Sequence, residues 1–477
     1  MFHVKHKPHI LLINPWITDF SAYNFWIKPL GLLVIGSLLR EHGFRVTLID
    51  CLDFPDKKKQ YGDGKFHKTK IQKPIPLKSI PRNYSRYGIP VEMLLEKLSS
   101  VEEPDLIAVT SGMTYWYPGA FEAIQIAKKS FKGVPIILGG IYASLCYEHA
   151  KEYSGADCVY KGGDEQGILE LIWKMTGLEF PHAPLGVHGY PEPCEVQGHS
   201  PEPIAIQGEN RELPYPAFDL YSQLDYVCIS TTRGCPFRCT YCATPVLSKE
   251  FHRRDPIGVA DEIEHWTTKY ALRNIAFYDD ALLIQSSEHI VPILKEVIRR
   301  GIQCNFHTPN ALHIREINDE VAGLLLRSGF KTIRLGLETS NEMIQNETGA
   351  KVNNEQFQHA TKLLRKAGYS EQNVGVYILA GLPGQRVEEV EESVAFVKEA
   401  GGRPIFVEYS PIPQTPLFEK AKQMSSFDLE EPLFHNNSLL PCQWEGFTLS
   451  DLRRVKEDLK GREASFFRDR TREVAQV

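Results

Sequence analysis

The sequence lacks an uninterrupted apolar stretch of membrane-spanning length, so we expect no transmembrane helix. Its N-terminus has a basic start, only a short apolar run at 9–14 and no small-residue cleavage site, which favours a first strand over a signal peptide. An excess of one charge is also missing, because 54 basic and 60 acidic residues give a net charge of -6. That balance gives no indication of a nucleic-acid or membrane partner. We expect a globular protein of the cytoplasm.

Cysteine is scarce, with ten in 477 residues. Seven stand alone in the sequence, and we interpret them as small buried apolar residues. The other three, Cys235, Cys239 and Cys242, lie within eight residues. In a cytoplasmic chain such a group favours metal binding or catalysis over disulfide formation.

The chain is too long for one ordinary domain, and its first third alternates short β-branched runs with amphipathic stretches. The predicted strands are 9–14, 45–50, 106–110, 135–139 and 158–160. The predicted helices are 30–42, 120–130, 144–153 and one that begins at 165. Strands that alternate with helices predict an α/β fold with a doubly wound, Rossmann-like parallel sheet over 1–175.

Two segments interrupt the alternation. The Lys- and Pro-rich segment at 53–90 has two interpretations, a solvated surface loop or a flap over a ligand or an anionic partner. The Pro-, Gly- and His-rich segment at 176–225 has weak periodicity and is interpreted as a linker between domains.

A second alternating series begins at residue 226. The predicted strands are 226–231, 274–278, 303–307, 332–337, 373–379 and 403–409. The predicted helices between them include 292–300, 320–328, 356–367 and 388–400. Six such units predict a partial (β/α)6 barrel of the TIM type over 226–420, whose sites collect at the C-terminal ends of the strands. Residues 421–477 are predicted to form a small helical extension.

The three clustered cysteines have the spacing C-x-x-x-C-x-x-C directly after the first barrel strand. Three thiolates on one short loop can hold a 4Fe-4S cluster and leave one iron open to a further ligand. Structural zinc is the alternative, but a closed zinc site needs four ligands, commonly as two C-x-x-C pairs, and no second pair is present.

The loop RGCPFRCTYCATP, including the aromatic Tyr241 before the third cysteine, resembles the cluster motif of radical S-adenosylmethionine enzymes. The resemblance implies that a 4Fe-4S cluster on Cys235, Cys239 and Cys242 passes an electron to S-adenosylmethionine. Methionine then leaves, and a 5′-deoxyadenosyl radical takes a hydrogen atom from a small-molecule or biosynthetic substrate. It also implies an external electron donor of the flavodoxin or ferredoxin type, and contact of Tyr241 with S-adenosylmethionine.

Three further segments resemble motifs of the same family at strand ends. Asp279 or Asp280 would accept a hydrogen bond from the ammonium group of S-adenosylmethionine, although a helix cap plus a solvated carboxylate also explains the pair. Glu338 would hold the ribose hydroxyls, with a structural ion pair as the alternative. In the turn at 381–384, Gly381 and Pro383 would lie beside the adenine. The sequence assigns no catalytic residue.

The N-terminal part resembles the cobalamin-binding domain of certain radical S-adenosylmethionine enzymes, on the segments 28–50, 110–114 and 138–144. The resemblance implies cobalamin contacts at five positions, namely Ser111, Thr114, Gly139, Gly140 and Tyr142. The D-x-H-x-x-G loop that supplies a cobalt-binding histidine in many such domains is replaced by NPWITDF. The aromatic residues Trp16 and 115–117 could line the macrocycle or pack between domains.

The sequence therefore predicts a radical S-adenosylmethionine enzyme with cobalamin as a further cofactor, most simply a methyltransferase acting on an unactivated carbon or phosphorus centre. A radical cyclase or rearranging enzyme with the same cofactors is the second interpretation. The third is a radical enzyme whose first domain is an interaction module without cobalamin. A methylthiotransferase is disfavoured, because no cysteine triad for a second cluster precedes the barrel. The substrate and the oligomeric state are not readable from the sequence.

Overall fold

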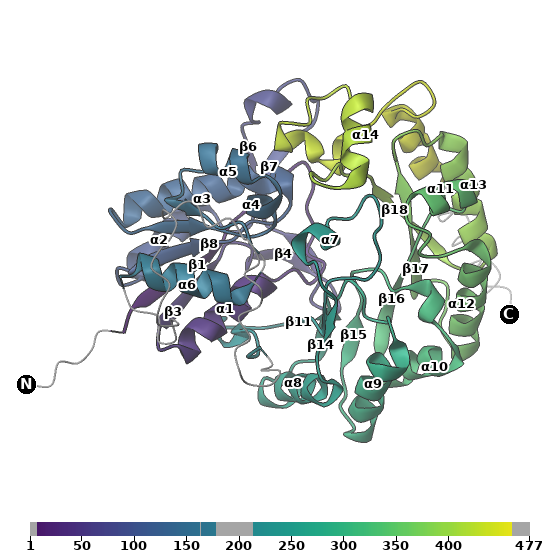
Figure 1. Ribbon diagram of the computed structural model, residues 1–477, viewed down its shortest axis with the longest axis horizontal. Coiled ribbons are helices and arrows are strands. Elements are labelled where there is room, and N and C mark those ends of the chain that lie inside the picture. The colour runs from purple at the N-terminus through teal and green to yellow at the C-terminus, as the bar shows by residue number, and fades with distance from the viewer. Residues whose placement is uncertain (1–6, 163, 178–212, 460–477) are drawn as a thin grey trace, which may run out of the picture. The chain divides into compact units, whose positions relative to one another are not determined.

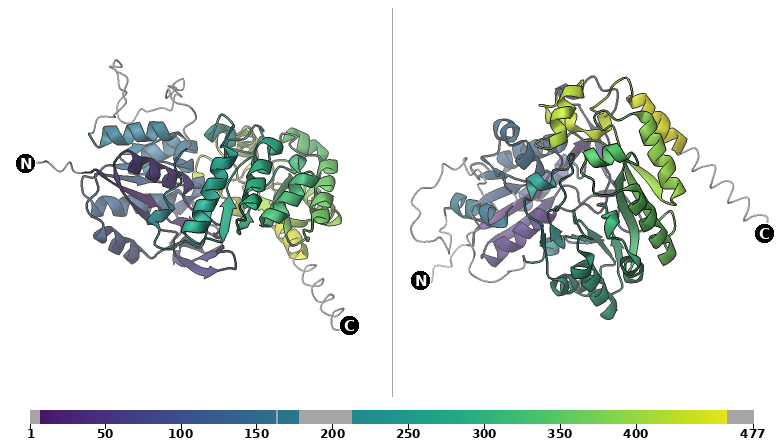
Figure 2. Two further views of the ribbon diagram at one scale, coloured as in Figure 1. Left: turned by 90° about the horizontal axis from the view of Figure 1, so that it is seen from below. Right: turned by 45° about the vertical axis from the view of Figure 1, so that its right-hand side comes forward.

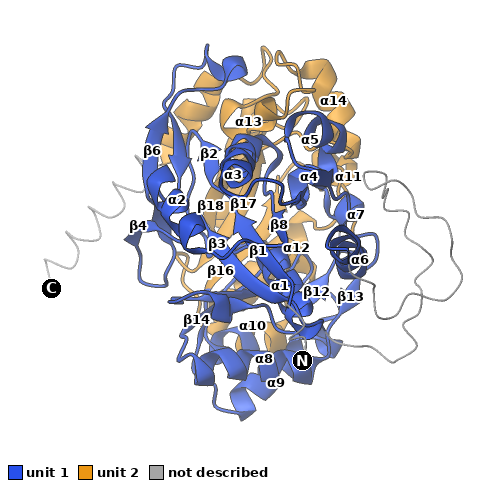
Figure 3. Cartoon of the chain, turned by 90° about the vertical axis from the view of Figure 1, so that its left-hand side faces the viewer, with its two compact units in different colours: residues 1–236, 243–310, 324–331 blue, residues 237–242, 311–323, 332–477 orange. Residues whose placement is uncertain are grey.

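The computed structural model describes residues 7–162, 164–177 and 213–459. The chain divides into two compact units, shown in Figure 3. Unit 1 comprises residues 1–236, 243–310 and 324–331, and unit 2 comprises residues 237–242, 311–323 and 332–477. No helix in the described part of the chain is long and apolar enough to cross a membrane.

Unit 1 begins with a five-stranded sheet in the order β10-β9-β8-β1-β3, with every neighbouring pair parallel. Strands β1, β3 and β8 are labelled in Figure 1. The strands are β1 (His9–Asn14), β3 (Arg45–Asp50), β8 (Leu106–Val109), β9 (Ile136–Leu138) and β10 (Cys158–Val159). In chain order the sheet runs 2-1-3-4-5. The strand order reverses between β1 and β8, and open α/β sheets bind ligands outside the strand ends at that reversal point.

Helices cover both faces of this sheet, as the views in Figures 1 and 2 show. Helices α1 (Leu30–Glu41) and α6 (Glu165–Met175) pack on one face, against Ile10 and Leu12 of β1. Helices α2 (Val91–Ser100) and α3 (Tyr117–Ser130) pack on the other face, against Leu11 and Ile13. Because β1 is buried on both faces, it is a continuous apolar run rather than an alternating one. The predicted doubly wound sheet is confirmed.

Shorter elements complete the N-terminal region of unit 1. Where one helix was predicted at 144–153, the structure has two, α4 (Ile141–Leu145) and α5 (Tyr147–Tyr153). The 3-10 turn η2 (Thr114–Trp116) precedes α3.

The interpretation of 53–90 as a solvated loop was wrong. This segment contains the hairpin β4 (Pro55–Lys58) and β5 (Gly64–Phe66), then β6 (Lys68–Ile71), the 3-10 turn η1 (Ile75–Leu77) and β7 (Tyr84–Tyr87). Strand β7 pairs antiparallel with both β6 and β2 (Ile17–Asp19). Apolar side chains such as Phe66, Leu77 and Tyr84 are buried, which gives the segment a core that its Lys-rich composition conceals.

The second sheet has the order β11-β14-β15-β16-β17-β18, which is also the chain order. Its strands are β11 (Val227–Ile229), β14 (Asn274–Phe277), β15 (Asn305–His307), β16 (Phe330–Glu338), β17 (Val374–Ala380) and β18 (Arg403–Glu408). The first three belong to unit 1, and β16 runs from unit 1 into unit 2. All six strands were predicted, with bounds that differ by at most two residues at either end. Each neighbouring pair with a described register is parallel, as a (β/α) barrel requires.

Helices follow the strands of this sheet. In unit 1 they are α7 (Thr244–Leu247), α8 (Pro256–Lys269), α9 (Ile290–Arg299) and the turn η4 (Ser286–Glu288), with the small ribbon β12 (Thr232–Arg233) and β13 (His252–Arg253). Between β15 and β16 lie η5 (Ile314–Glu316) and α10 (Asp319–Ser328). In unit 2 they are α11 (Glu342–Glu347), α12 (Asn354–Ala367), α13 (Val387–Glu399) and α14 (Pro416–Met424).

The C-terminal region has η6 (Pro432–His435), η7 (Asn437–Leu439) and a last helix at 449–459. Its apolar residues Leu429 and Cys442 share a core cluster with Leu379 and Tyr409, which lie at or just after the ends of β17 and β18.

The two units divide the chain at places other than the predicted domain ends. Within unit 1, Trp26 stacks on His307 of β15 with ring centroids 4.3 Å apart, and Tyr61 lies against the same His307 ring. The Tyr226 hydroxyl donates to Asn24, 3.0 Å away. The N-terminal sheet and the first three barrel strands therefore form one compact body. Most of the predicted linker 176–225 lies outside the described residues; its described end includes η3 (Phe218–Leu220), with Phe218 fully buried.

Candidate functional site

Between β11 and the cysteine loop the chain turns at Thr231 and Thr232, and Asp279 holds this turn in place. Oδ1 of Asp279, just after β14, accepts hydrogen bonds from the backbone N–H and hydroxyl groups of Thr231 and Thr232, at 2.5 to 2.8 Å. Burial raises the pKa of Asp279 to about 6, although these four hydrogen bonds favour the ionised form. Thr231 and Thr232 come directly before the loop that carries Cys235, so Asp279 sets the direction in which that loop starts.

The two predicted acidic residues therefore differ in their surroundings. Oδ2 of Asp279 is buried and has no hydrogen-bond partner within the described residues. Asp280 is exposed and accepts a hydrogen bond from the Thr244 hydroxyl at 3.2 Å. Asp279 retains one oxygen for a ligand, whereas Asp280 is open to solvent.

A buried histidine joins the same hydrogen-bond network. His289, at the N-terminal end of α9, lies with Nε2 2.8 Å from the Thr231 hydroxyl oxygen. Because that hydroxyl donates to Asp279, Nε2 is the donor to Thr231. Burial, together with Arg253 and Arg254, lowers the pKa of His289 to about 4.

Cys239 and Cys242 belong to unit 2 and are set by its backbone. The Cys242 N–H donates to the Cys239 carbonyl at 3.1 Å, which turns the chain between the two thiols. Between them, the Thr240 N–H donates to the Thr348 carbonyl, and the Thr240 carbonyl accepts from the Leu417 N–H.

Gly349 allows another segment to approach this loop closely. Its φ is +128°, and a Cβ at this position would lie 3.0 Å from the Cys239 Cα and 3.4 Å from the Cys239 Sγ. A side chain at residue 349 would therefore press directly on the cysteine loop.

Phe237, which lies between the first two cysteines in sequence, is held between two side chains of unit 2. His313 stacks on it with ring centroids 4.9 Å apart, and the Arg315 guanidinium lies 4.8 Å from the ring centroid. Arg315 also donates to the carbonyls of Ala350 and Lys351. These contacts give a structural role to the segment 307–317, to which the sequence assigned no chemistry.

Glu338 ends β16 in a strained conformation with φ of +68°, at an irregularity in the β16–β17 pairing. For a residue other than glycine this backbone conformation costs energy, and such strain gathers at functional sites. Its Oε1 is 2.5 Å from the ammonium group of Lys351, and both side chains are largely buried. The alternative interpretation of Glu338, a structural ion pair, is therefore present.

Lys351 is a candidate site residue that sequence reasoning missed. Burial alone would lower the pKa of Lys351, but the Glu338 carboxylate and the Cys239 thiol outweigh it and raise the pKa. Its Nζ lies 5.8 Å from the centroid of the Tyr241 ring, and Tyr241 hydrogen-bonds to the Cys239 thiol. A lone lysine 13 residues after Glu338 carries no sequence signal. Unit 2 nevertheless brings Cys239, Tyr241, Glu338 and Lys351 together.

The turn after β17 is built around Gln385, another residue the sequence did not single out. Oε1 of Gln385 accepts from the N–H groups of Gly381 and Leu382, and its Nε2 donates to the Leu379 carbonyl. Gly381 has φ of +89°, and a Cβ there would lie 2.4 Å from a methyl carbon of Leu440. Pro383 is buried within this turn. The close approach at Gly381 is thus made by Leu440 of the same unit.

Cys235 lies in unit 1, whereas Cys239 and Cys242 lie in unit 2. Over the described residues, no three His, Cys, Asp or Glu side chains gather at metal-binding distance. The donor set nevertheless suits a 4Fe-4S cluster, because the three thiols lie within eight residues of one loop and none is in a disulfide.

The edge of the N-terminal sheet is the second candidate site. After β8 and β9, the Ser111 hydroxyl donates to the Gly139 carbonyl at 2.6 Å and accepts from the Ala143 N–H at 3.2 Å. Gly140 has φ of +95°, and a Cβ there would lie only 2.4 Å from the Ser111 carbonyl oxygen. A Cβ on Gly139 would meet nothing within 4 Å. Gly139 therefore borders open space, while Gly140 is required by the fold.

Other predicted residues at this edge are packed inside unit 1. Tyr142 is fully buried, with its hydroxyl 2.6 Å from His149 Nδ1, and Thr114 is also buried. The Trp16 N–H donates to the Ile89 carbonyl at 2.7 Å, and the Trp116 N–H donates to Asp19 at 2.8 Å. The aromatic group consequently packs within unit 1, and Gly139 is the predicted cobalamin contact that borders space.

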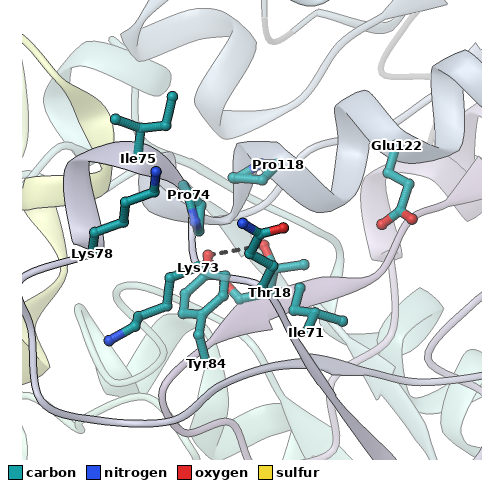
Figure 4. Close-up of a pocket in the computed structure, with 10 residues that line it drawn as sticks. Thr18, Ile71, Lys73, Pro74, Ile75, Lys78, Tyr84, Pro118 and Glu122 are labelled. Atoms are coloured by element: carbon teal, nitrogen blue, oxygen red, sulfur yellow. Dashed lines mark hydrogen bonds between the residues drawn. The ribbon is translucent and has the colours of Figure 1, made fainter.

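A cavity of about 420 Å³ lies beside β6, η1 and β7 in unit 1 (Figure 4). The Tyr84 hydroxyl donates to Thr18 there, and the Glu122 carboxylate is paired with Arg86. The ammonium of Lys73 is bonded to the Ile80 carbonyl. These charged groups are engaged, so the cavity offers no convergent acid–base or metal-binding set.

Comparison with known proteins gives a family match within the second sheet and its helices. Residues 229–397 match the family model of the radical SAM superfamily, where SAM denotes S-adenosylmethionine. The match begins at the end of β11 and ends within α13, so it covers the cysteine loop, Glu338 and the Gly381 turn.

Two relatives and one solved structure extend the likeness to the N-terminal region. An uncharacterised methyltransferase of Pyrococcus horikoshii is 25% identical over 75% of this chain and 75% of its own length. The anaerobic magnesium-protoporphyrin IX monomethyl ester cyclase of Rubrivivax gelatinosus is 23% identical over 71% of this chain and 62% of its own. The radical S-adenosylmethionine methyltransferase TsrM of Kitasatospora setae, solved with cobalamin and a [4Fe-4S] cluster, has the same fold. Its TM-score is 0.63 at 19% identity, over 88% of this chain and 76% of that one.

Proposed function

We propose that this chain, whose residues 229–397 match the radical SAM superfamily, is a cobalamin-dependent radical S-adenosylmethionine methyltransferase that acts on an unactivated carbon or phosphorus centre of a small molecule. The observation that carries the proposal is the open edge at Gly139, beside the reversal point of a 2-1-3-4-5 sheet. The relative named a methyltransferase and the fold shared with TsrM support it.

We propose a role for each group of site residues. Cys235, Cys239 and Cys242 hold a 4Fe-4S cluster. Asp279 fixes the start of their loop through Oδ1, and its remaining carboxylate oxygen, Oδ2, accepts a hydrogen bond from the ammonium of S-adenosylmethionine.

Glu338 accepts hydrogen bonds from the ribose hydroxyl groups, and Lys351 is its counter-charge. Tyr241, Gly381 and Pro383 border the rest of S-adenosylmethionine. When bound, the cluster supplies the electron that cleaves S-adenosylmethionine, and cobalamin supplies the methyl group.

The N-terminal site depends on backbone and shape. Gly139 leaves room for the nucleotide tail of cobalamin, while Ser111 and Gly140 hold the two loops that flank it. Thr114 and Tyr142 support these loops from inside. No D-x-H-x-x-G loop is present, so we propose that the cobalt has no histidine ligand from this chain.

The proposed domains are a cobalamin-binding domain at 1–175, a linker at 176–225, the radical barrel at 226–420 and a C-terminal extension at 421–477. We propose a cytoplasmic location, because a cluster on cysteine thiolates needs a reducing compartment. An external carrier of the flavodoxin or ferredoxin type would supply the electron.

The products distinguish methyl transfer from other radical outcomes. Protein reconstituted with iron, sulfide and cobalamin is incubated without oxygen with S-adenosylmethionine, a reductant and small-molecule fractions of an extract. Methyl transfer consumes one S-adenosylmethionine as methyl donor and a second as radical source. It therefore predicts about equal amounts of S-adenosylhomocysteine and 5′-deoxyadenosine in the active fraction, together with a product heavier by one methylene unit.

A radical cyclase is the second candidate, favoured by the relative named as an ester cyclase. It would release 5′-deoxyadenosine without S-adenosylhomocysteine, and its product would carry no added methyl group. That result would replace the methyl-transfer proposal with the cyclase.

A further inference from the structure

A strained turn of unit 2 holds the backbone of Lys351 near the cysteine loop. Gly349 lies so close to that loop that a Cβ on it would be 3.4 Å from the Cys239 Sγ. Ala350 has φ of +49°, a conformation that costs energy for a residue other than glycine. Arg315 donates to the carbonyls of Ala350 and Lys351, each at 2.8 Å. Lys351 therefore has a fixed place near Cys239.

Two side chains of unit 2 act on the Cys239 sulfur. The Tyr241 hydroxyl hydrogen-bonds to it. The Lys351 ammonium lies 5.8 Å from the centroid of the Tyr241 ring and is paired with Glu338 at 2.5 Å. Cys239 nevertheless interacts electrostatically with Lys351 more strongly than with Glu338. The sulfur is therefore exposed to one hydrogen-bond donor and to a positive charge that its counter-charge does not cancel.

The stability of unit 2 does not account for this arrangement. A buried ion pair such as Lys351–Glu338 is generally no more stabilising than apolar side chains of similar volume. Both Glu338 and Ala350, which position the pair, have strained backbones. The Tyr241 ring packs against an apolar cluster that includes Leu382, and a phenylalanine ring would fill the same space. The hydroxyl of Tyr241 and the ammonium of Lys351 are thus the two features that packing does not need.

We propose that Tyr241 and Lys351 raise the reduction potential of the 4Fe-4S cluster by acting on the Cys239 sulfur. This inference rests on the proposed function, which places the cluster on Cys239. Reduction adds one electron to the cluster, and the added negative charge spreads onto the cysteine sulfurs. A hydrogen bond donated to a sulfur and a positive charge beside it both stabilise the reduced form. Burial strengthens both interactions, because it lowers the local dielectric constant.

The test is a redox titration of full-length protein with its reconstituted cluster, in which titanium(III) citrate is the reductant and electron paramagnetic resonance measures the reduced cluster. S-adenosylmethionine is left out, so its proposed contact with Tyr241 does not affect the result. The variants are Tyr241→Phe, Lys351→Met and Lys351→Arg. One matched control, Tyr409→Phe, removes a buried hydroxyl that has no hydrogen-bond partner among the described residues. The other, Lys366→Met, removes an exposed lysine that is paired with Asp319.

Tyr241→Phe and Lys351→Met should each lower the midpoint potential of the cluster. At the wild-type midpoint, the ratio of reduced to oxidised cluster should fall about 10-fold in each variant, which corresponds to about 59 mV for one electron. Lys351→Arg should keep the wild-type potential because it keeps the positive charge, and both controls should keep it as well. Lys351→Met combined with Glu338→Gln should still have a lowered potential, because the charge of Lys351 acts on Cys239 more strongly than that of Glu338.

Tyr241→Phe and Lys351→Met proteins with full iron content and the wild-type potential would overturn the inference. An equal loss of potential in the matched controls would overturn it too. If Tyr241→Phe does not load iron, the Lys351 variants decide, and a wild-type potential in the double variant would show that Lys351 only balances the charge of Glu338. Wild-type protein that fails to load about four iron atoms per chain would instead contradict the proposed function.

Discussion

The two sheet edges of this protein differ in how they are prepared for a ligand. At the barrel edge, charged groups are buried and the backbone is strained: Glu338 has φ of +68° and pairs with Lys351, and Asp279 keeps one buried oxygen without a partner. At the N-terminal edge, the polar groups satisfy one another, and Ser111 bonds to the backbone of Gly139 and Ala143. What this edge offers a ligand is the open space beside Gly139.

This difference matches the two proposed ligands. S-adenosylmethionine carries an ammonium, a carboxylate, a sulfonium and ribose hydroxyls, so its site needs charges held in place before binding. A cobalamin tail is large, and a strand edge that is closed by its own hydrogen bonds can hold it by shape. The barrel edge should therefore respond to changes of charge, and the N-terminal edge to changes of volume.

Removal of the cluster ligands should have the largest effect at the barrel edge. Replacement of Cys235, Cys239 and Cys242 by Ala should leave folded protein with almost no iron after anaerobic reconstitution, because each thiolate is a direct ligand. Iron is measured per chain. The matched control replaces the buried Cys228, Cys304 and Cys442, whose pKa burial raises to about 12, and should load iron normally. A full iron content in the first variant would contradict the cluster assignment.

Two neighbouring glycines test the N-terminal edge. Gly139→Leu should abolish cobalamin retention and leave the iron content unchanged, because its side chain enters open space. Gly140→Leu should lower both, because its Cβ would collide with the Ser111 backbone and damage the fold. Cobalt and iron are measured on the same samples. Cobalamin retention by Gly139→Leu at the wild-type level would show that cobalamin does not bind beside Gly139.

Charge at the barrel edge is tested with Glu338 and Lys351. Glu338→Gln should raise the Kd for S-adenosylmethionine by about 10-fold or more, since hydrogen bonds to a charged group contribute roughly 1.5–3 kcal/mol. This variant also leaves Lys351 buried without its counter-charge, which lowers stability. Glu338→Gln combined with Lys351→Met should recover the melting temperature but not the Kd. Recovery of both would show that Glu338 is only the partner of Lys351.

The smallest expected effect concerns pH. The pKa of His289 is lowered from 6.5 to about 4 in the folded protein, so its contribution to stability is present above pH 6.5 and is lost as the pH falls towards 4. Relative to a His289→Asn variant, the wild type should lose about 3 kcal/mol over this range, since one pKa unit corresponds to about 1.4 kcal/mol. Asp279 acts in the opposite direction, because its raised pKa favours the folded state as the pH falls below 6. Parallel stability curves for the two proteins would contradict a neutral buried His289.

The sequence predicted the parts of the fold that depend on periodicity and local spacing. All strands of both parallel sheets were predicted, because buried parallel strands are apolar runs between helical patterns. The segment 53–90 was missed as folded structure, since its core rests on a few residues such as Phe66 and Leu77 among many lysines.

The site was predictable only where a motif is continuous in sequence. The cysteine loop is such a motif, but the partners of Glu338 and Asp279 are not. Lys351 and Thr231 reach them through tertiary packing, and neither has a distinctive neighbourhood in the sequence. The distinction between Gly139 and Gly140 likewise depends on which backbone lies opposite each residue.

The central claim is that one chain carries a different cofactor at each of its two sheet edges. The most direct measurement is the iron and cobalt content of wild-type protein purified without oxygen, reconstituted with iron and sulfide, supplied with cobalamin and freed of unbound ligand. The account predicts about four iron atoms and about one cobalt atom per chain. Protein with a full complement of iron that never retains cobalt would contradict it, and would make the N-terminal sheet an interaction module.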